Sequence, residues 1–160
     1  MRRSLFLYLA LVCFIGLVAI FIVDGYLGIY DTIYITAREY EQEVEPDFWL
    51  RQDQAWSIVA TWGEKTFFRY EVDNRRFSTY STTIQASVWK ENQKIIDLLT
   101  EDKVVKSFDK ATVEWTLDSK ELESRGFSVG EYTVKIERDG VERRIIARYP
   151  TEYPAKPVIR

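Results

Sequence analysis

The chain has 160 residues, with 22 Lys and Arg against 25 Asp and Glu, and a formal net charge of −3 at pH 7. This balance offers no basic surface of the kind that nucleic acids attract, so nucleic-acid binding is excluded. The sequence contains no histidine, which removes the commonest general base, the Ser-His-Asp triad and every histidine-based metal site. We therefore expect no catalytic residue, no metal and no cofactor.

The chain begins with an apolar segment, Leu5–Val23, that contains no charged residue and no proline. At about 1.5 Å per residue, a helix of this length matches a hydrocarbon layer of about 30 Å. Arg2 and Arg3 precede it, and basic flanks stay on the cytoplasmic side of a membrane. The sequence therefore predicts a single-pass signal-anchor in the cell membrane, with residues 1–24 as the cytoplasmic stub and spanning helix and the rest of the chain extracytoplasmic.

Two features bear on how this segment is processed. A cleaved signal peptide has a shorter apolar region followed by small residues, whereas this run ends at Asp24 without an Ala-x-Ala site, so retention is favoured. Cys13 is the only cysteine, which excludes disulfides from the rest of the chain and favours a prokaryotic origin over a disulfide-dense secreted domain. Residues 25–31 are expected to form a short juxtamembrane segment.

An acidic stretch follows, in which every second residue carries a carboxylate. The positions are Glu39, Glu41, Glu43, Glu45 and Asp47. In an extended strand these side chains share one side, where they could contact a basic partner or a Ca²⁺ ion. A straight row does not converge on a point as calcium ligands must, so the simpler interpretation is a solvated strand edge, neutralised across the sheet by Arg143 or Arg148.

Most of the remaining chain alternates apolar and polar residues, which is the pattern of half-buried strands. The alternating apolar residues are Trp56, Ile58 and Ala60; Phe68, Tyr70 and Val72; Ile84, Ala86 and Val88; and Val113, Trp115 and Leu117. A β-branched and aromatic run at 32–36 adds an earlier strand. The stretch 94–108 fits either a short helix or two brief strands.

The clearest local signal is a β-hairpin near the end of the chain. Asp139-Gly140 separates two alternating runs and is typical of a two-residue type I′ turn. Such a turn pairs residue 138 with 141, 136 with 143, 134 with 145 and 132 with 147. The fold class predicted from all these patterns is mainly β, an N-terminal transmembrane helix followed by an antiparallel sandwich of about seven or eight strands over residues 32–150, with 151–160 as an extended tail.

The segments V-E-W-T-L at Val113–Leu117 and V-G-E-Y-T-V-K-I at Val129–Ile136 resemble the last part of prokaryotic immunoglobulin-like or fibronectin-like β-sandwich modules. The resemblance implies an immunoglobulin-like sandwich that acts as a spacer, an adhesive unit or a docking platform, and it names no specific functional family. The immunoglobulin disulfide is absent, since no cysteine follows Cys13.

Trp89 departs from the pattern of its strand. It shares the polar phase with Gln85 and Ser87, next to a turn at Glu91-Asn92. An exposed indole at this place is a candidate contact for a partner protein or a sugar. The alternative is a β-bulge that turns Trp89 into the core.

The sequence favours a non-enzymatic binding or structural module, anchored in the membrane, with another cell-envelope protein as its partner. One alternative is a pilin-like filament subunit, because an apolar N-terminal helix followed by a β-rich head resembles pilins in outline. A second alternative, an anchored hydrolase, requires a Ser-Lys dyad such as Ser57 with Lys65 or Ser87 with Lys90. The residues expected to contact a partner are Trp89, Glu39, Glu41, Glu43 and Glu45.

Overall fold

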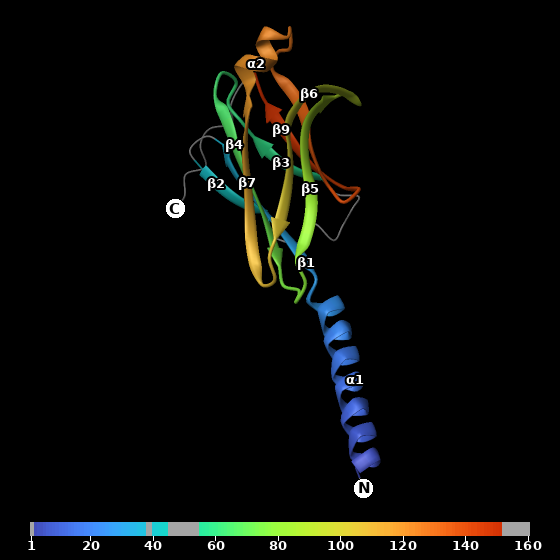
Figure 1. Ribbon diagram of the computed structural model, residues 1–160. Helices are drawn as coiled ribbons and strands as arrows, with labels where there is room; N and C mark the ends of the chain where they lie inside the picture. The colour runs from blue at the N-terminus through green and yellow to red at the C-terminus, as the bar shows by residue number, and fades with distance from the viewer. Residues whose placement is uncertain (1, 38–39, 45–54, 152–160) are drawn as a thin grey trace, which may run out of the picture.

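The computed structural model describes residues 2–37, 40–44 and 55–151, with side chains described for residues 9–23, 28–37 and 55–151. One sheet contains β2 (Tyr40–Val44), β1 (Ile29–Ala37), β4 (Lys65–Asn74) and β7 (Asp109–Asp118), in that order. The other contains β3 (Ala55–Val59), β9 (Val141–Tyr149), β8 (Gly130–Arg138), β5 (Tyr80–Lys90) and β6 (Gln93–Val105). Two helices, α1 (Arg2–Leu27) and α2 (Ser119–Ser124), complete the described elements (Figure 1).

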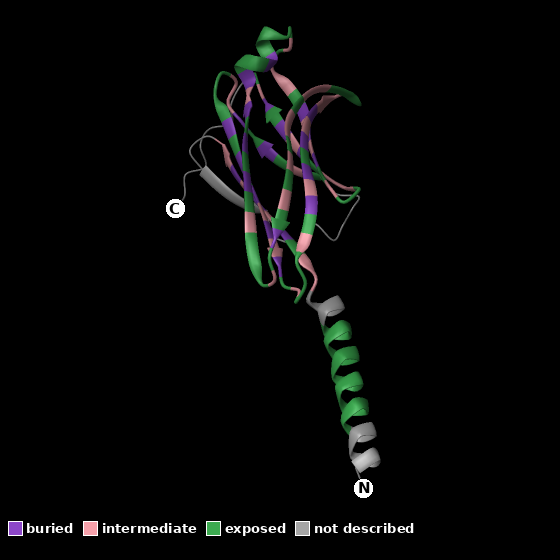
Figure 2. Ribbon diagram, in the orientation of Figure 1, coloured by how far each residue is buried: buried purple, intermediate pink, exposed green. Residues whose placement is uncertain are grey.

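The two sheets share one hydrophobic core because alternate side chains of each strand point inward. Buried and exposed residues accordingly alternate along the strands (Figure 2). The four-stranded sheet contributes Phe68 and Trp115, whose rings stack with centroids 5.6 Å apart. The five-stranded sheet contributes Tyr132 and Tyr149, which meet edge to face at 5.9 Å. These aromatic pairs, with Ile, Val and Leu side chains between them, hold the sheets together.

The hairpin predicted around Asp139-Gly140 is confirmed. β8 and β9 pair antiparallel with Arg138 opposite Val141 and Val134 opposite Ile145, the register that the sequence predicted. Both turn residues have positive φ, +52° for Asp139 and +74° for Gly140, as a type I′ turn requires. The local signals that define a short hairpin were therefore sufficient to fix both its turn and its register.

Three features of the strands differ from the sequence-based expectations. β3 pairs with β9 in parallel, so the sandwich is not wholly antiparallel; the two strands lie far apart in the chain, and no turn constrains their direction. The described strands number nine, one more than the upper expectation. β1 begins at Ile29 instead of residue 32, and the ambiguous stretch 94–108 forms most of the long strand β6.

The prediction that Leu5–Val23 forms a transmembrane helix is wrong. Among the residues that the structure describes, no helix is long and apolar enough to cross a membrane. The predicted fold class with its spanning helix, the single-pass topology and the cell-membrane localisation are corrected accordingly.

Candidate interaction surface

The outer face of the four-stranded sheet carries the most distinctive group of exposed side chains. Strand pairing places Tyr34 of β1, Arg69 of β4 and Glu114 of β7 in one row across the sheet. The neighbouring row contains Phe67, between a threonine on each side. All of these positions are out of phase with the buried residues of their strands, so they face away from the core.

A hollow of about 440 Å³ lies on this face. Its lining consists of Tyr34, Thr36, Phe67, Phe68, Arg69, Glu114, Trp115 and Thr116. Phe67 is 51 % exposed, and the guanidinium of Arg69 lies 4.3 Å from the centre of the Tyr34 ring. We call this hollow the sheet-face site; six of its residues face outward, whereas Phe68 and Trp115 are buried residues whose rings stack in the core. It combines an open aromatic surface with a planar cation, a carboxylate and two hydroxyl groups on three paired strands, which hold them rigidly.

The charges around the sheet-face site favour a basic ligand. Glu114 is exposed on β7, an edge strand of this sheet, and strand β2 at the other edge pairs Glu43 with Tyr34 and Glu41 with Thr36. Three acidic residues therefore occupy positions in the site or on the strand β2 paired with it, against one arginine, Arg69. Farther along the face, acidic residues are already neutralised, as in the ion pair between Lys110 Nζ and Glu71 Oε1 at 2.6 Å.

The structure separates the members of the predicted acidic row. Glu41 and Glu43 lie in β2, the edge strand of the four-stranded sheet, whereas Glu39, Glu45 and Asp47 lie outside the described residues. The expected neutralisation by Arg143 or Arg148 is wrong, because both arginines belong to β9 in the other sheet. Arg148 instead pairs with Glu131 at 3.0 Å. Sequence alone could not assign β2 and β9 to different sheets.

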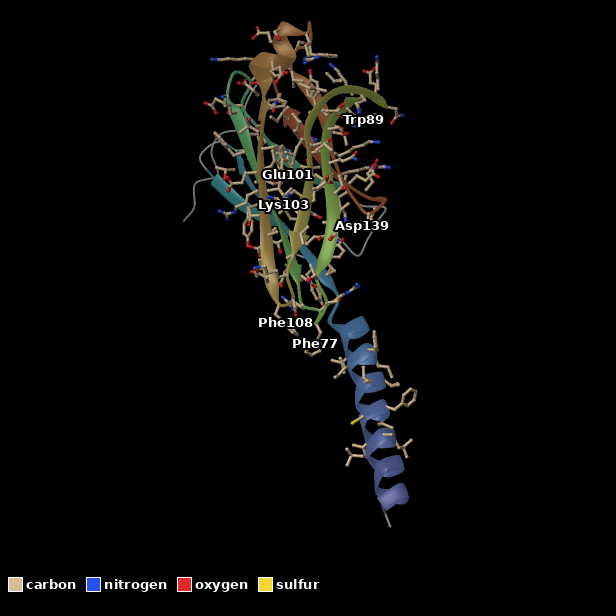
Figure 3. All side chains as sticks on the ribbon, viewed as in Figure 1. Phe77, Trp89, Glu101, Lys103, Phe108 and Asp139 are labelled. Atoms are coloured by element: carbon tan, nitrogen blue, oxygen red, sulfur yellow. The ribbon has the colours of Figure 1, made fainter. Side chains whose placement is uncertain are left out.

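Trp89 lies on the opposite side of the molecule, on the outer face of the five-stranded sheet (Figure 3). A register shift does occur between Val88 and Trp89, but the indole remains outside the core and is half-buried. Its Nε1 donates a hydrogen bond to Ser87 Oγ at 2.9 Å, and the Lys135 ammonium lies 4.0 Å from the ring centre. Trp89 therefore has intramolecular partners, and it is not brought together with the acidic row.

Replacing Trp89 by alanine is expected to lower the free energy of unfolding by about 1 to 2 kcal/mol, because the half-buried ring and its cation–π contact with Lys135 are both lost. The W89F variant keeps a ring beneath Lys135 and should lose less. Urea denaturation followed by circular dichroism measures both. A W89A protein with an unchanged unfolding midpoint would instead restore Trp89 as a residue free for partner contact.

A partly buried ionic cluster at the β8–β9 turn was not anticipated from the sequence. Arg138 donates from Nη2 and Nε to Asp31 Oδ2 at 2.9 and 3.2 Å, and its Nη1 lies 3.2 Å from Asp139 Oδ2. The Tyr80 hydroxyl bonds to Arg138 and Asp139. One feature of the sequence could have indicated this cluster: Asp31 is an acidic residue on the side of β1 whose other residues are apolar.

Burial determines the electrostatics of this cluster. It raises the pKa of Asp31 above the ordinary value for an aspartate, while the Arg138 guanidinium acts in the opposite direction. Burial also raises the pKa of Tyr70, which lies near both groups. Because Asp31 and Arg138 are paired with each other and largely enclosed, we assign the cluster to stability and not to ligand binding.

Ser87 and Lys90, one of the two candidate Ser-Lys pairs, each contact an aromatic side chain. The Ser87 hydroxyl accepts a hydrogen bond from the Trp89 indole, and the Lys90 ammonium lies 5.0 Å from the centre of the Tyr132 ring, over an aromatic face. Among the residues with described positions, no group of three or more His, Cys, Asp or Glu side chains could hold a metal ion.

The comparisons with known proteins do not identify a family. No family model matches the chain, and no curated protein matches it. Among solved structures, the chain is similar to the alkylpurine DNA glycosylase AlkC of Pseudomonas fluorescens bound to DNA containing an abasic site analogue (11 % identity, TM-score 0.42, covering 56 % of this chain and 27 % of that one). It is also similar to the β-glucosidase EmGH1 of Erythrobacter marinus (15 % identity, TM-score 0.40, covering 59 % and 14 %). The chain thus spans a small part of either protein.

Proposed function

We propose that this protein is a non-enzymatic binding module that holds a basic, aromatic segment of a polypeptide on the outer face of its four-stranded sheet. The observation that carries the proposal is the sheet-face site, a hollow of about 440 Å³ on three hydrogen-bonded strands. Tyrosine, arginine and phenylalanine are the residue types enriched in the centres of protein interfaces. A rigid sheet also spares the complex the entropy cost of ordering loops.

The composition of the site defines the ligand. The exposed ring of Phe67 and the Tyr34 ring offer apolar contact to an aromatic side chain, with favourable edge-to-face geometry. Glu114 attracts Lys or Arg beside that aromatic side chain, and strand β2 adds two acidic positions, Glu41 and Glu43, in register with Thr36 and Tyr34. An acidic segment would meet like charges and is disfavoured.

The proposal is tested by selecting peptides from a phage-displayed random library on the immobilised full chain. Enriched peptides should contain Lys or Arg next to an aromatic residue, and the F67A variant should bind them at least about tenfold more weakly, because an aromatic contact at an interface centre is lost. The Q85A variant alters an exposed residue on the other sheet and serves as the matched control. Enrichment of acidic peptides, or equal binding by F67A and the unaltered protein, would contradict the proposal.

A further inference from the structure

Two phenylalanines form an exposed apolar projection at the end of the β domain where α1 joins it (Figure 3). Phe77 is 51 % exposed and Phe108 is 57 % exposed, and their rings meet edge to face with centroids 4.9 Å apart. We call the loops at residues 75–79 and 106–108, which carry these rings, the tip. Two large apolar side chains exposed together in this way are typical of a surface that another molecule covers.

The tip is held in one conformation by hydrogen bonds between its loops. Asn74 is fully buried, and its Nδ2 donates to the carbonyl oxygens of Ser78 at 2.8 Å and Lys106 at 3.0 Å. The Ser107 hydroxyl donates to the Arg76 carbonyl oxygen at 2.9 Å. Because both loops are fixed before any partner arrives, binding through the two rings would cost little additional order.

The backbone at Phe108 supports a role beyond folding. Its φ is +54°, in the left-handed region that bulky side chains seldom occupy. A strained conformation persists only where the surrounding structure enforces it, and such residues cluster at functional sites. Here the strained residue is one of the two whose rings pack together at the exposed tip.

The tip is basic as well as aromatic. Its two loops contain Arg75, Arg76 and Lys106 and no acidic residue. Arg75 is engaged by Asp73 at 2.9 Å, whereas Lys106 is exposed and has no ion pair among the residues that the structure describes. The tip therefore presents paired phenyl rings flanked by positive charge, which is the ligand chemistry proposed above for the sheet-face site.

We propose that the segment bound at the sheet-face site is the tip of a second copy of this chain. The inference rests on the proposed function and names its partner. The complementarity is twofold: phenyl rings meet an open aromatic hollow, and the basic loops meet a surface with three acidic residues against one arginine.

The contact must be intermolecular. Arg69 in the sheet-face site and Asn74 at the base of the tip lie on the same strand, five residues or about 16 Å apart, so a tip cannot fold back onto its own face. The two surfaces are also different, which makes the contact heterologous. Such contacts repeat from copy to copy and generate rings or open chains of molecules, in keeping with a filament subunit.

Site-specific cross-linking of the full chain tests this contact. In a C13S background, which removes the only native cysteine, one protein carries T79C in the tip and another carries T116C in the sheet-face site. A short bismaleimide should join the two into a covalent heterodimer when they are mixed. Q85C, exposed on the other sheet, is the matched control for T116C and should give at least tenfold less product. Adding F77A and F108A to the T79C protein should lower the heterodimer yield by the same factor.

The outcomes separate this inference from the proposed function. Equal cross-linking of T79C to T116C and Q85C, or none to T116C, would overturn self-association through the tip, whereas peptide selection at the sheet-face site could still succeed. Loss of binding to phosphatidylglycerol vesicles in the F77A/F108A protein, with cross-linking to T116C unchanged, would assign the tip to a lipid surface and would equally overturn the inference.

Discussion

Replacing Arg138 by methionine is expected to lower the free energy of unfolding by about 3 to 5 kcal/mol at pH 7, because the substitution leaves the Asp31 carboxylate buried without its cation. The Asp31 side chain is only 6 % exposed and that of Arg138 14 %, so water cannot replace the lost partner easily. Methionine preserves most of the side-chain volume, which limits any packing contribution. Urea denaturation of the two proteins measures the difference.

The pH dependence of this loss identifies its cause. Burial places the pKa of Asp31 above its value in the unfolded chain. Between those two pKa values the folded protein binds more protons than the unfolded protein, so the contribution of Asp31 to stability decreases as the pH rises through that interval. Without Arg138 the pKa of Asp31 rises further, because the group that lowered it is gone. The deficit of R138M should therefore shrink as the pH falls from 7 towards 4.

A second variant provides the control. In D31N/R138M no carboxylate remains to be buried, so the double variant should be no less stable than R138M at pH 7 despite carrying one more change. Its stability relative to the unaltered protein should also vary less with pH than that of R138M. A deficit of R138M that is the same at pH 7 and pH 4 would show that lost packing, and not the unpaired Asp31 charge, causes the destabilisation.

The sequence predicted those parts of the fold that local patterns determine. Alternation placed Phe68 and Tyr70 inside and Phe67 and Arg69 outside, because successive side chains of a strand point to opposite faces. The Asp139-Gly140 turn fixed the register of β8 and β9, since a two-residue loop leaves only one pairing. Neither inference required knowledge of the rest of the chain.

Long-range pairing could not be predicted in the same way. Tyr34 joins Phe67 and Arg69 in the sheet-face site only because β1 pairs with β4, and alternation says nothing about which strands are neighbours. Asp31 and Arg138 are separated by 107 positions in the chain, so their contact left no local pattern beyond one acid on an apolar phase. The sequence predicted the row of acidic residues. Whether Arg143 or Arg148 could neutralise Glu41 and Glu43 depended on the sheet to which β2 belongs, which alternation does not determine.

Removing the Asn74 side chain is expected to cost about 2 to 4 kcal/mol of unfolding free energy, because buried polar groups that lose their partners retain the full desolvation penalty. Asn74 Nδ2 donates to the carbonyl oxygens of Ser78, Val105 and Lys106, and its Oδ1 accepts a hydrogen bond from the Arg76 amide at 3.1 Å. In N74A all of these backbone groups lose a partner, although part of the site is open enough for water to restore some of the bonds.

The S107A variant separates the contribution of the Asn74 side chain from that of the single Ser107 hydrogen bond between the same two loops. Ser107 makes a single bond to the Arg76 carbonyl oxygen, so its loss should cost only about 1 kcal/mol. If the Asn74 amide is what holds Phe77 against Phe108, N74A should also lower the yield of the T79C–T116C cross-link at temperatures where the protein stays folded, and S107A should leave it nearly unchanged. An N74A protein as stable as S107A would mean that water satisfies the three carbonyl oxygens and that the two loops do not depend on this side chain.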